Sequence, residues 1–168
     1  MHNKVKELKH SKNETDRREC IVLLQAQLTN NPDDVEAWYN KACCHDFLGE
    51  EKEAEPCYRH CFNVGWQKLP EPEQKSFFVG FGSTLRNNLK YAESISVLSE
   101  AVRIFPHYPA LKAFLALAYY SSRNDKLAAE TLFSACLDAA EKGFDGYERA
   151  IQWYVEHLHD HPEPREDL

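Results

Sequence analysis

Residues 37–61 read AWYNKACCHDFLGEEKEAEPCYRHC, and two interpretations of this stretch compete. Its four cysteines and two histidines are typical of a metal site. The same residues also place a tryptophan, a Leu-Gly pair and an Ala-x3-Tyr at spacings that a helical repeat uses. The choice depends on whether these spacings recur, because an internal repeat governs the interpretation of the whole chain.

The spacings do recur, with a period of 34 residues. The pairs that keep an apolar or small character over this step are Phe81 and Leu115, Gly82 and Ala116, Leu85 and Tyr119, Leu98 and Leu132, and Ala101 and Ala135. Phe78 corresponds instead to Trp38, forty residues earlier, so six extra residues separate the first two copies. They fit the segment 63–74, where Gly65 can end a helix and Pro70 can begin the next one.

This pattern resembles the tetratricopeptide repeat, whose signature is W-x2-L-G-x2-Y, then A-x3-F, then P over 34 residues. The matching positions are Trp38, Ala54 and Tyr58 in the first copy, Phe81, Gly82 and Pro106 in the second, and Leu115, Ala116 and Tyr119 in the third. The first copy departs from the signature, with Lys41-Ala42 in place of Leu-Gly. The resemblance covers about residues 15–140. It implies an all-α fold, a right-handed superhelical solenoid of helix-turn-helix repeats with a C-terminal capping helix.

Predicted boundaries follow from the same alignment. A polar N-terminal segment (1–14) precedes a helical domain (15–160), and a flexible acidic tail (161–168) follows it. We predict repeats at about 35–66, 75–108 and 109–142, and a cap helix at 146–159. The helices of the repeats are expected at 35–48, 51–64, 73–87, 91–105, 109–122 and 125–141. A leading helix that contains CIVLLQAQLTNNP is expected to begin with a capping box formed by Ser11 and Glu14.

Within this arrangement the cysteines are small apolar core residues. Cys44 lies two positions after Ala42 on the predicted buried face, and Cys61 occupies the position of Ala101 and Ala135 in the later copies. A free cysteine packs like a small hydrophobe. The alternative is a metal-binding or redox-responsive site whose ligands would be Cys57, His60 and Cys61, with Cys43 or His45. Cysteines one helical turn apart are not a C-x2-C knuckle, so we expect no metal and no cofactor.

The composition excludes several classes of function. The formal net charge of −7 repels phosphate backbones, so we expect no nucleic-acid partner. No apolar run approaches the ~20 residues needed to cross a bilayer, and the charged N-terminus lacks the apolar region of a signal peptide. We therefore expect no membrane association and a cytoplasmic protein with six reduced cysteines.

No G-x-S-x-G, G-x4-GK[ST], G-x-G-x-x-G or H-E-x-x-H motif is present, so we expect no enzyme. The glycines at 80 and 82 lie in an apolar helical pattern, which indicates close helix packing.

The resemblance also implies where the function resides. In such arrays the first helices line a concave side, where a partner's extended or helical segment binds. The residues expected to face this groove are Tyr39, Asn40, Cys43, Phe47, Val79, Ser83, Arg86, Asn87, Phe114, Leu117 and Tyr120. Aromatic area beside amide groups suits a peptide backbone and its apolar side chains. We therefore predict a non-catalytic module that binds a protein or peptide ligand, of the adaptor or co-chaperone type. The family's lysine-and-asparagine clamp for acidic tails is not reproduced.

Self-assembly is the alternative function. Trp153 is expected to project away from the apolar stripe of the cap helix, given ~100° per residue. An exposed tryptophan on a terminal helix can anchor a contact, here a homodimer through the capping helices. The competing expectation is that the C-terminal tail folds back over this ring.

Overall fold

The computed structural model describes residues 2–142 together with 144, 146, 147, 149, 150 and 153. Its helices are α1 (His2–Leu8), α2 (Glu14–Asn30), α3 (Val35–Phe47), α4 (Glu51–Val64), α5 (Glu71–Asn87), α6 (Tyr91–Ile104), α7 (Pro109–Ser121) and α8 (Asp125–Lys142), with a short 3₁₀ turn, η1 (Trp66–Lys68), after α4. Over the described part of the chain there is no strand, and the all-α prediction is confirmed. The six helices predicted for the repeats begin and end within two residues of α3 to α8.

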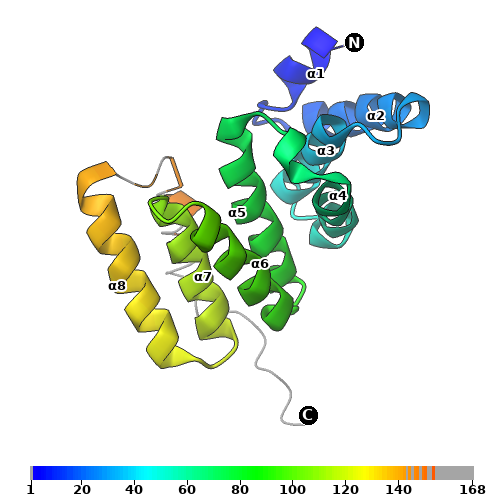
Figure 1. The fold of residues 1–168 in the computed structure, drawn as a ribbon. Coiled ribbons are helices and arrows are strands. Elements are labelled where there is room, and N and C mark those ends of the chain that lie inside the picture. The colour runs from blue at the N-terminus through cyan, green and yellow to red at the C-terminus, as the bar shows by residue number, and fades with distance from the viewer. Residues whose placement is uncertain (1, 143, 145, 148, 151–152, 154–168) are drawn as a thin grey trace.

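The helices stack as hairpins in two layers (Figure 1). The first helices of the pairs, α3, α5 and α7, contact one another in order and form the inner layer. The second helices, α4, α6 and α8, pack against first helices and form the outer layer. At the N-terminal end α2 packs on α3 and α1 packs on α2. This is the repeat arrangement in which each unit contacts only its neighbours.

Local chemistry accounts for the helix starts. Asp34 caps α3, because its Oδ1 accepts a hydrogen bond of 2.9 Å from the backbone N–H of Ala37. The helix α2 is capped by Asn13, whose Oδ1 accepts from the N–H of Thr15 at 2.8 Å. The capping box predicted at Ser11 and Glu14 was therefore wrong. The Ser11 hydroxyl instead accepts from the N–H of Asn13 in the turn before the helix.

The predicted insertion lies between α4 and α5. Gly65 ends α4 at a φ of +120°, a backbone conformation that residues other than glycine rarely adopt. Pro70 directly precedes the first residue of α5. The inserted residues pack against the main core through Trp66. The ring of Trp66 lies 4.7 Å from that of Phe78 and 6.2 Å from that of Phe105, so the insertion covers one end of the core.

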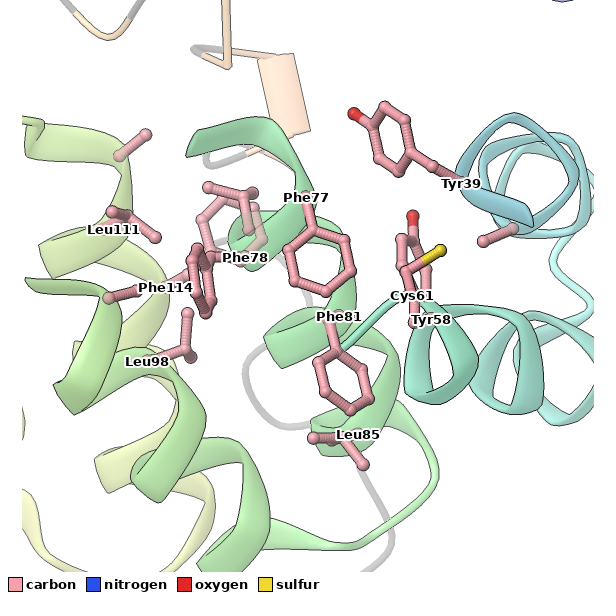
Figure 2. Close-up of a cluster of buried hydrophobic side chains, with 14 of the residues drawn as sticks. Tyr39, Tyr58, Cys61, Phe77, Phe78, Phe81, Leu85, Leu98, Leu111 and Phe114 are labelled. Atoms are coloured by element: carbon pink, nitrogen blue, oxygen red, sulfur yellow. The ribbon is translucent and has the colours of Figure 1, made fainter. Parts of the chain in front are cut away.

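The main core lies between the two layers (Figure 2). Three phenylalanines of α5, Phe77, Phe78 and Phe81, fill its centre and are fully buried or nearly so. Tyr39 and Tyr58 from the first hairpin flank them on one side, and Leu98, Leu111 and Phe114 flank them on the other. Because α5 contacts both neighbouring hairpins, its apolar side chains join them in one continuous core.

Both glycines of α5 mark close helix contacts, as predicted. A Cβ atom on Gly82 would lie 2.4 Å from Cγ of Leu98 in α6, and the Ser94 hydroxyl donates to the Gly82 carbonyl at 2.7 Å. On the opposite side, a Cβ on Gly80 would lie 2.3 Å from the hydroxyl oxygen of Tyr58 in α4. The pair therefore lets α5 approach two outer helices at once.

The N-terminal segment that was predicted as polar contains a short helix. Residues 2–8 form α1, and Val5 is buried in a second, smaller core. This core consists of Val5, Cys20, Leu24, Leu28, Ala37 and Cys44. The segment is polar in composition, but the burial of Val5 holds it against α2, and an exposed ion pair between Lys4 and Glu19 joins the same two helices.

Candidate functional site

A hollow of about 310 Å³ opens on the inner layer, and we call it the inner groove. Its lining residues are Tyr39, Cys43 and Asp46 of α3, Glu51 and Tyr58 of α4, Ser76, Val79, Gly80, Ser83 and Asn87 of α5, Phe114 of α7, and Tyr147 and Ala150 after α8. This volume is at the lower end of the range for ligand sites. The inner groove can therefore hold one or two side chains of a partner, with the remainder of the partner lying across the rim.

Six of the residues predicted for the groove line this hollow: Tyr39, Cys43, Val79, Ser83, Asn87 and Phe114. They come from three successive first helices, as the repeat pattern implied. Tyr39, Val79 and Phe114 are nevertheless buried, so little of each side chain is exposed at the hollow. These three were predicted to face solvent, and that prediction was wrong, because the inner helices contact each other closely enough to cover most of each side chain.

Asn40 and Arg86 were also predicted to be solvent-facing, and both are buried. Asn40 is 6% exposed and accepts a hydrogen bond of 3.0 Å from Nζ of Lys9, in the turn between α1 and α2. Arg86 is 1% exposed, and its Nε donates to the hydroxyl of Ser121 at 2.7 Å and to the carbonyl of Leu117 at 3.3 Å. A guanidinium against the last turn of a helix is favourable. These two side chains therefore join neighbouring elements of the solenoid.

The remaining predicted positions lie elsewhere. Leu117 is buried in the main core. Phe47 is exposed, but on the side of α2, where the guanidinium of Arg17 lies 4.3 Å from the centre of its ring. Tyr120 is half-buried near the end of α7 and is not among the residues that line the inner groove.

The floor of the groove holds the carboxyl group of Asp46. Asp46 accepts hydrogen bonds from the hydroxyl of Tyr58 at 2.5 Å and from the hydroxyl of Thr84 at 2.7 Å. Burial raises the pKa of Asp46 to about 7 in spite of these two bonds. Asp46 lies three residues after Cys43, on the same face of α3.

A carboxyl group with a pKa near 7 can transfer protons, but catalysis needs a second activated group. The nearest thiol is that of Cys43, whose sulfur lies 3.8 Å from the hydroxyl oxygen of Tyr58. Burial raises the pKa of Cys43 to about 12, so this thiol stays protonated and is a poor nucleophile at neutral pH. The chemistry of the floor therefore favours binding by hydrogen bonds.

The cysteines of the first repeat behave as packing residues. Cys61 is buried and donates to the backbone carbonyl of Val35 at 3.5 Å, and Cys57 donates to that of Glu53 at 3.4 Å. Burial raises the pKa of Cys57 to about 11. The ring of His60 lies 4.5 Å from that of Trp38. Among the residues that the structure describes, no group of three histidine, cysteine or acidic side chains is placed to hold a metal ion.

The chain returns to the inner groove after α8. The ring of Tyr147 meets that of Phe114 edge to face, with centres 6.1 Å apart and planes at 79°. Tyr147 and Ala150 both pack against the main core and form one wall of the groove. Most of the predicted cap helix (146–159) lies outside the described residues, whereas Trp153 is described and is 52% exposed.

These features define a class of protein: a solenoid of helical hairpins with a narrow aromatic groove on its inner layer. The model of the family described as "Tetratrico peptide repeat" matches residues 35–158, and the chain belongs to the tetratricopeptide repeat family. Members of this family are generally non-catalytic modules of protein–protein interaction that bind proteins or peptides. No curated protein matches this sequence. Within the described ranges, no helix combines the length and the apolar character that crossing a bilayer requires.

Proposed function

We propose that this protein is a cytoplasmic adaptor or co-chaperone that binds a segment of a partner protein in the inner groove. The observation that carries the proposal is the convergence of residues from three successive first helices on one hollow, with Tyr39 and Phe114 at its walls. Aromatic residues that are held rigidly by a core lose little entropy when they bind, and such residues dominate binding energy at interfaces.

The polar groups of the groove suit the orientation of a partner. The side-chain amide of Asn87 donates to Glu51 at 3.3 Å, and the carboxyl of Asp46 lies at the floor. A few fixed polar groups among apolar walls set the orientation of a ligand, whereas the apolar area supplies most of the affinity. The net charge of −7 supports a partner that is a protein and not a nucleic acid.

The test is site-specific photocrosslinking in cells from position 83, at the groove, and from position 96, an exposed serine of α6. We expect one partner to be captured from position 83 only. In the unlabelled protein, Ser83→Arg should fill the groove and abolish binding of that partner, whereas Ser96→Arg should not. If the partner binds both variants equally, groove binding is incorrect, even if the protein has partners elsewhere.

A second proposal is a homo-oligomer that assembles through the C-terminal end. The exposure of Trp153 and of Phe133, which is 73% exposed on α8, supports this proposal. Sedimentation equilibrium at micromolar concentration decides between the two functions, because a monomer at all concentrations removes self-assembly.

A further inference from the structure

We propose that the inner groove binds an arginine side chain presented by the partner's segment, and that the carboxyl groups of Asp46 and Glu51 hold its guanidinium among the aromatic rings of the walls. This inference rests on the proposed function, since it names the side chain that the same groove accepts.

The first support is the charge of the lining. Asp46 and Glu51 both line the inner groove, and among the described residues no lysine, arginine or histidine lines it. The other titratable side chains at the lining are Tyr39, Cys43, Tyr58 and Tyr147. Burial raises the pKa of Cys43 to about 12 and raises the pKa of Tyr39 and of Tyr58, so these three groups stay protonated. The lining therefore offers negative charge and no positive charge to a ligand.

The second support is that neutral groups hold both carboxyls. Asp46 accepts hydrogen bonds from the hydroxyls of Tyr58 and Thr84, and Glu51 accepts one from the side-chain amide of Asn87. Within the described part of the chain, no basic side chain forms an ion pair with Asp46 or Glu51. A half-buried carboxyl without a cation is costly to ionise, and an arginine from a partner would supply the missing charge.

The outer layer shows how this chain holds an arginine with the same kinds of group. Between α4 and α6 the guanidinium of Arg59 donates to Glu55 at 2.7 Å and to Glu93 at 2.9 Å. It also lies 5.9 Å from the centre of the Phe81 ring. The inner groove likewise combines two carboxyls with aromatic rings, and the rings of Tyr39 and Tyr58 lie 6.4 Å apart beside it (Figure 2). An arginine of the partner would complete the corresponding arrangement.

The shape and the walls of the groove favour arginine over lysine. A guanidinium is planar, is weakly hydrated and stacks on aromatic faces, whereas an ammonium group is a strongly hydrated point charge. The hollow measures only about 310 Å³, and its aromatic walls include the buried rings of Tyr39 and Phe114. Losing water to enter such a site costs an ammonium group more. The five N–H donors of arginine can also reach both carboxyls at once.

Binding of the arginine should release a proton from Asp46. In the free protein its pKa is about 7, because burial and the nearby charge of Glu51 oppose ionisation. Beyond the lining, Glu73 of α5 acts on Tyr39, and its carboxyl is paired with Lys9 at 3.4 Å. A guanidinium beside Asp46 favours the ionised form and lowers this pKa. Affinity should therefore rise with pH, and binding should be about tenfold tighter at pH 8 than at pH 6.

The probe for the test is N-acetyl-arginine amide, with N-acetyl-citrulline amide as its uncharged match. Each is titrated against the full-length protein, labelled with carbon-13 at the aspartate carboxyls, and the Asp46 signal is assigned by its absence in Asp46→Asn. We expect saturable binding of the arginine probe, on the order of millimolar for a ligand of this size. The titration midpoint of Asp46 should fall by at least about one pH unit.

The controls separate the groove from general effects of charge. The citrulline probe, in the same concentration of sodium chloride, should leave the midpoint of Asp46 unchanged. The signal of Asp33, which is exposed in the turn before α3, should respond to neither probe. Ser83→Arg places a side chain across the groove and should abolish binding of the arginine probe.

Three results would overturn the inference. The first is an unchanged midpoint of Asp46 with the arginine probe, and the second is an equal change with the citrulline probe. The third is an equal or larger change with N-acetyl-lysine amide, because the groove would then bind cations without preference for arginine.

The proposed function is tested separately, by capture of a partner from position 83. A captured partner that still binds after each arginine of its bound segment is replaced by glutamine would refute arginine recognition and leave groove binding intact.

Discussion

Two of the hollows lined by the described residues differ greatly in construction. The inner groove measures about 310 Å³, whereas a hollow on the outer layer between α4 and α6 measures about 650 Å³. The outer hollow is lined largely by polar and charged side chains: Arg59, Asn63, Glu93, Ser96, Ser99, Glu100 and Arg103, with Phe62, Phe81 and Val97. The inner groove has walls of buried aromatic residues that the core holds in place. Specific binding depends on rigid, desolvated walls more than on volume, so the smaller hollow is the better site.

The largest expected contrast is in stability. Phe77→Ala removes a fully buried ring that contacts Tyr39 and Tyr58, and we expect a loss of about 3–5 kcal/mol in the free energy of unfolding. Phe62→Ala, at a partly exposed ring of the outer hollow, should cost less than half as much. Urea denaturation of both variants measures the difference. Similar losses of unfolding free energy in the two variants would mean that Phe62 at the outer hollow is packed as firmly as Phe77 in the core.

The two layers should also respond to pH in opposite directions. Burial raises the pKa of Asp46 from 3.8 to about 7, so the folded protein binds an extra proton between these values and stability falls as pH rises through this window. Asp46→Asn lacks this titration. Relative to the variant, the wild type should lose about 2–4 kcal/mol between pH 4 and pH 8, at 1.36 kcal/mol per pKa unit. Denaturation midpoints of the wild type and of Asp46→Asn across this pH range test the expectation. The same dependence on pH in both proteins would contradict it.

In the outer layer, the pKa of Glu55 in α4 is shifted in the opposite direction. Burial opposes its charge, but hydrogen bonds from Lys90, Arg59 and Asn88 lower the pKa of Glu55 from 4.5 to about 2. Its stabilising contribution is present above pH 4.5 and is lost as pH falls toward 2. Glu55→Gln should therefore destabilise the protein by about 2–3 kcal/mol at pH 7, and this difference should disappear near pH 2. A loss that is independent of pH would indicate a packing defect.

A smaller effect is expected where the layers touch. Gly80→Ala would place a methyl group against the hydroxyl of Tyr58 and disturb its bond to Asp46, at a cost of about 1–3 kcal/mol. Tyr58→Phe removes that hydroxyl, so the cost of Gly80→Ala should be smaller in the Tyr58→Phe background. A double-mutant cycle measures this coupling. Additive losses would mean that the methyl group is accommodated by another movement.

The smallest effect is expected at the rim of the outer hollow. Arg103 and Glu100 form an ion pair on the surface of α6. Exposed pairs are screened by water and contribute little. Arg103→Gln should leave the midpoint of urea denaturation unchanged, and a clear shift would show that the outer hollow is more ordered than its polar lining suggests.

Some features of the fold were predictable because they depend on neighbours in sequence. The end of α4 at Gly65 and the start of α5 after Pro70 follow from backbone preferences that act over a few residues. The burial of Cys61 followed from its place in the period, where Ala101 and Ala135 are also buried. The resemblance to the tetratricopeptide repeat likewise implied that the first helices form one layer.

The lining of the groove was predictable only in part. The apolar stripe of a helix indicates which side packs against its own partner, but each inner helix has further neighbours. Lys9 reaches Asn40 from 31 residues earlier in the chain, and Arg86 reaches Ser121 from 35 residues before it. Neither contact leaves a periodic signal, so both residues were predicted as exposed groove positions.

The sequence by itself determined the helices, their order and the repeat family, because local preferences and a regular apolar period act within and between adjacent hairpins. Only the tertiary structure decided which side chains face the hollow, how Asp46 is enclosed by Tyr58 and Thr84, and that Tyr147 returns to Phe114. These outcomes depend on distances between residues far apart in the chain. Such distances are set by the packing of the whole stack and not by any one segment.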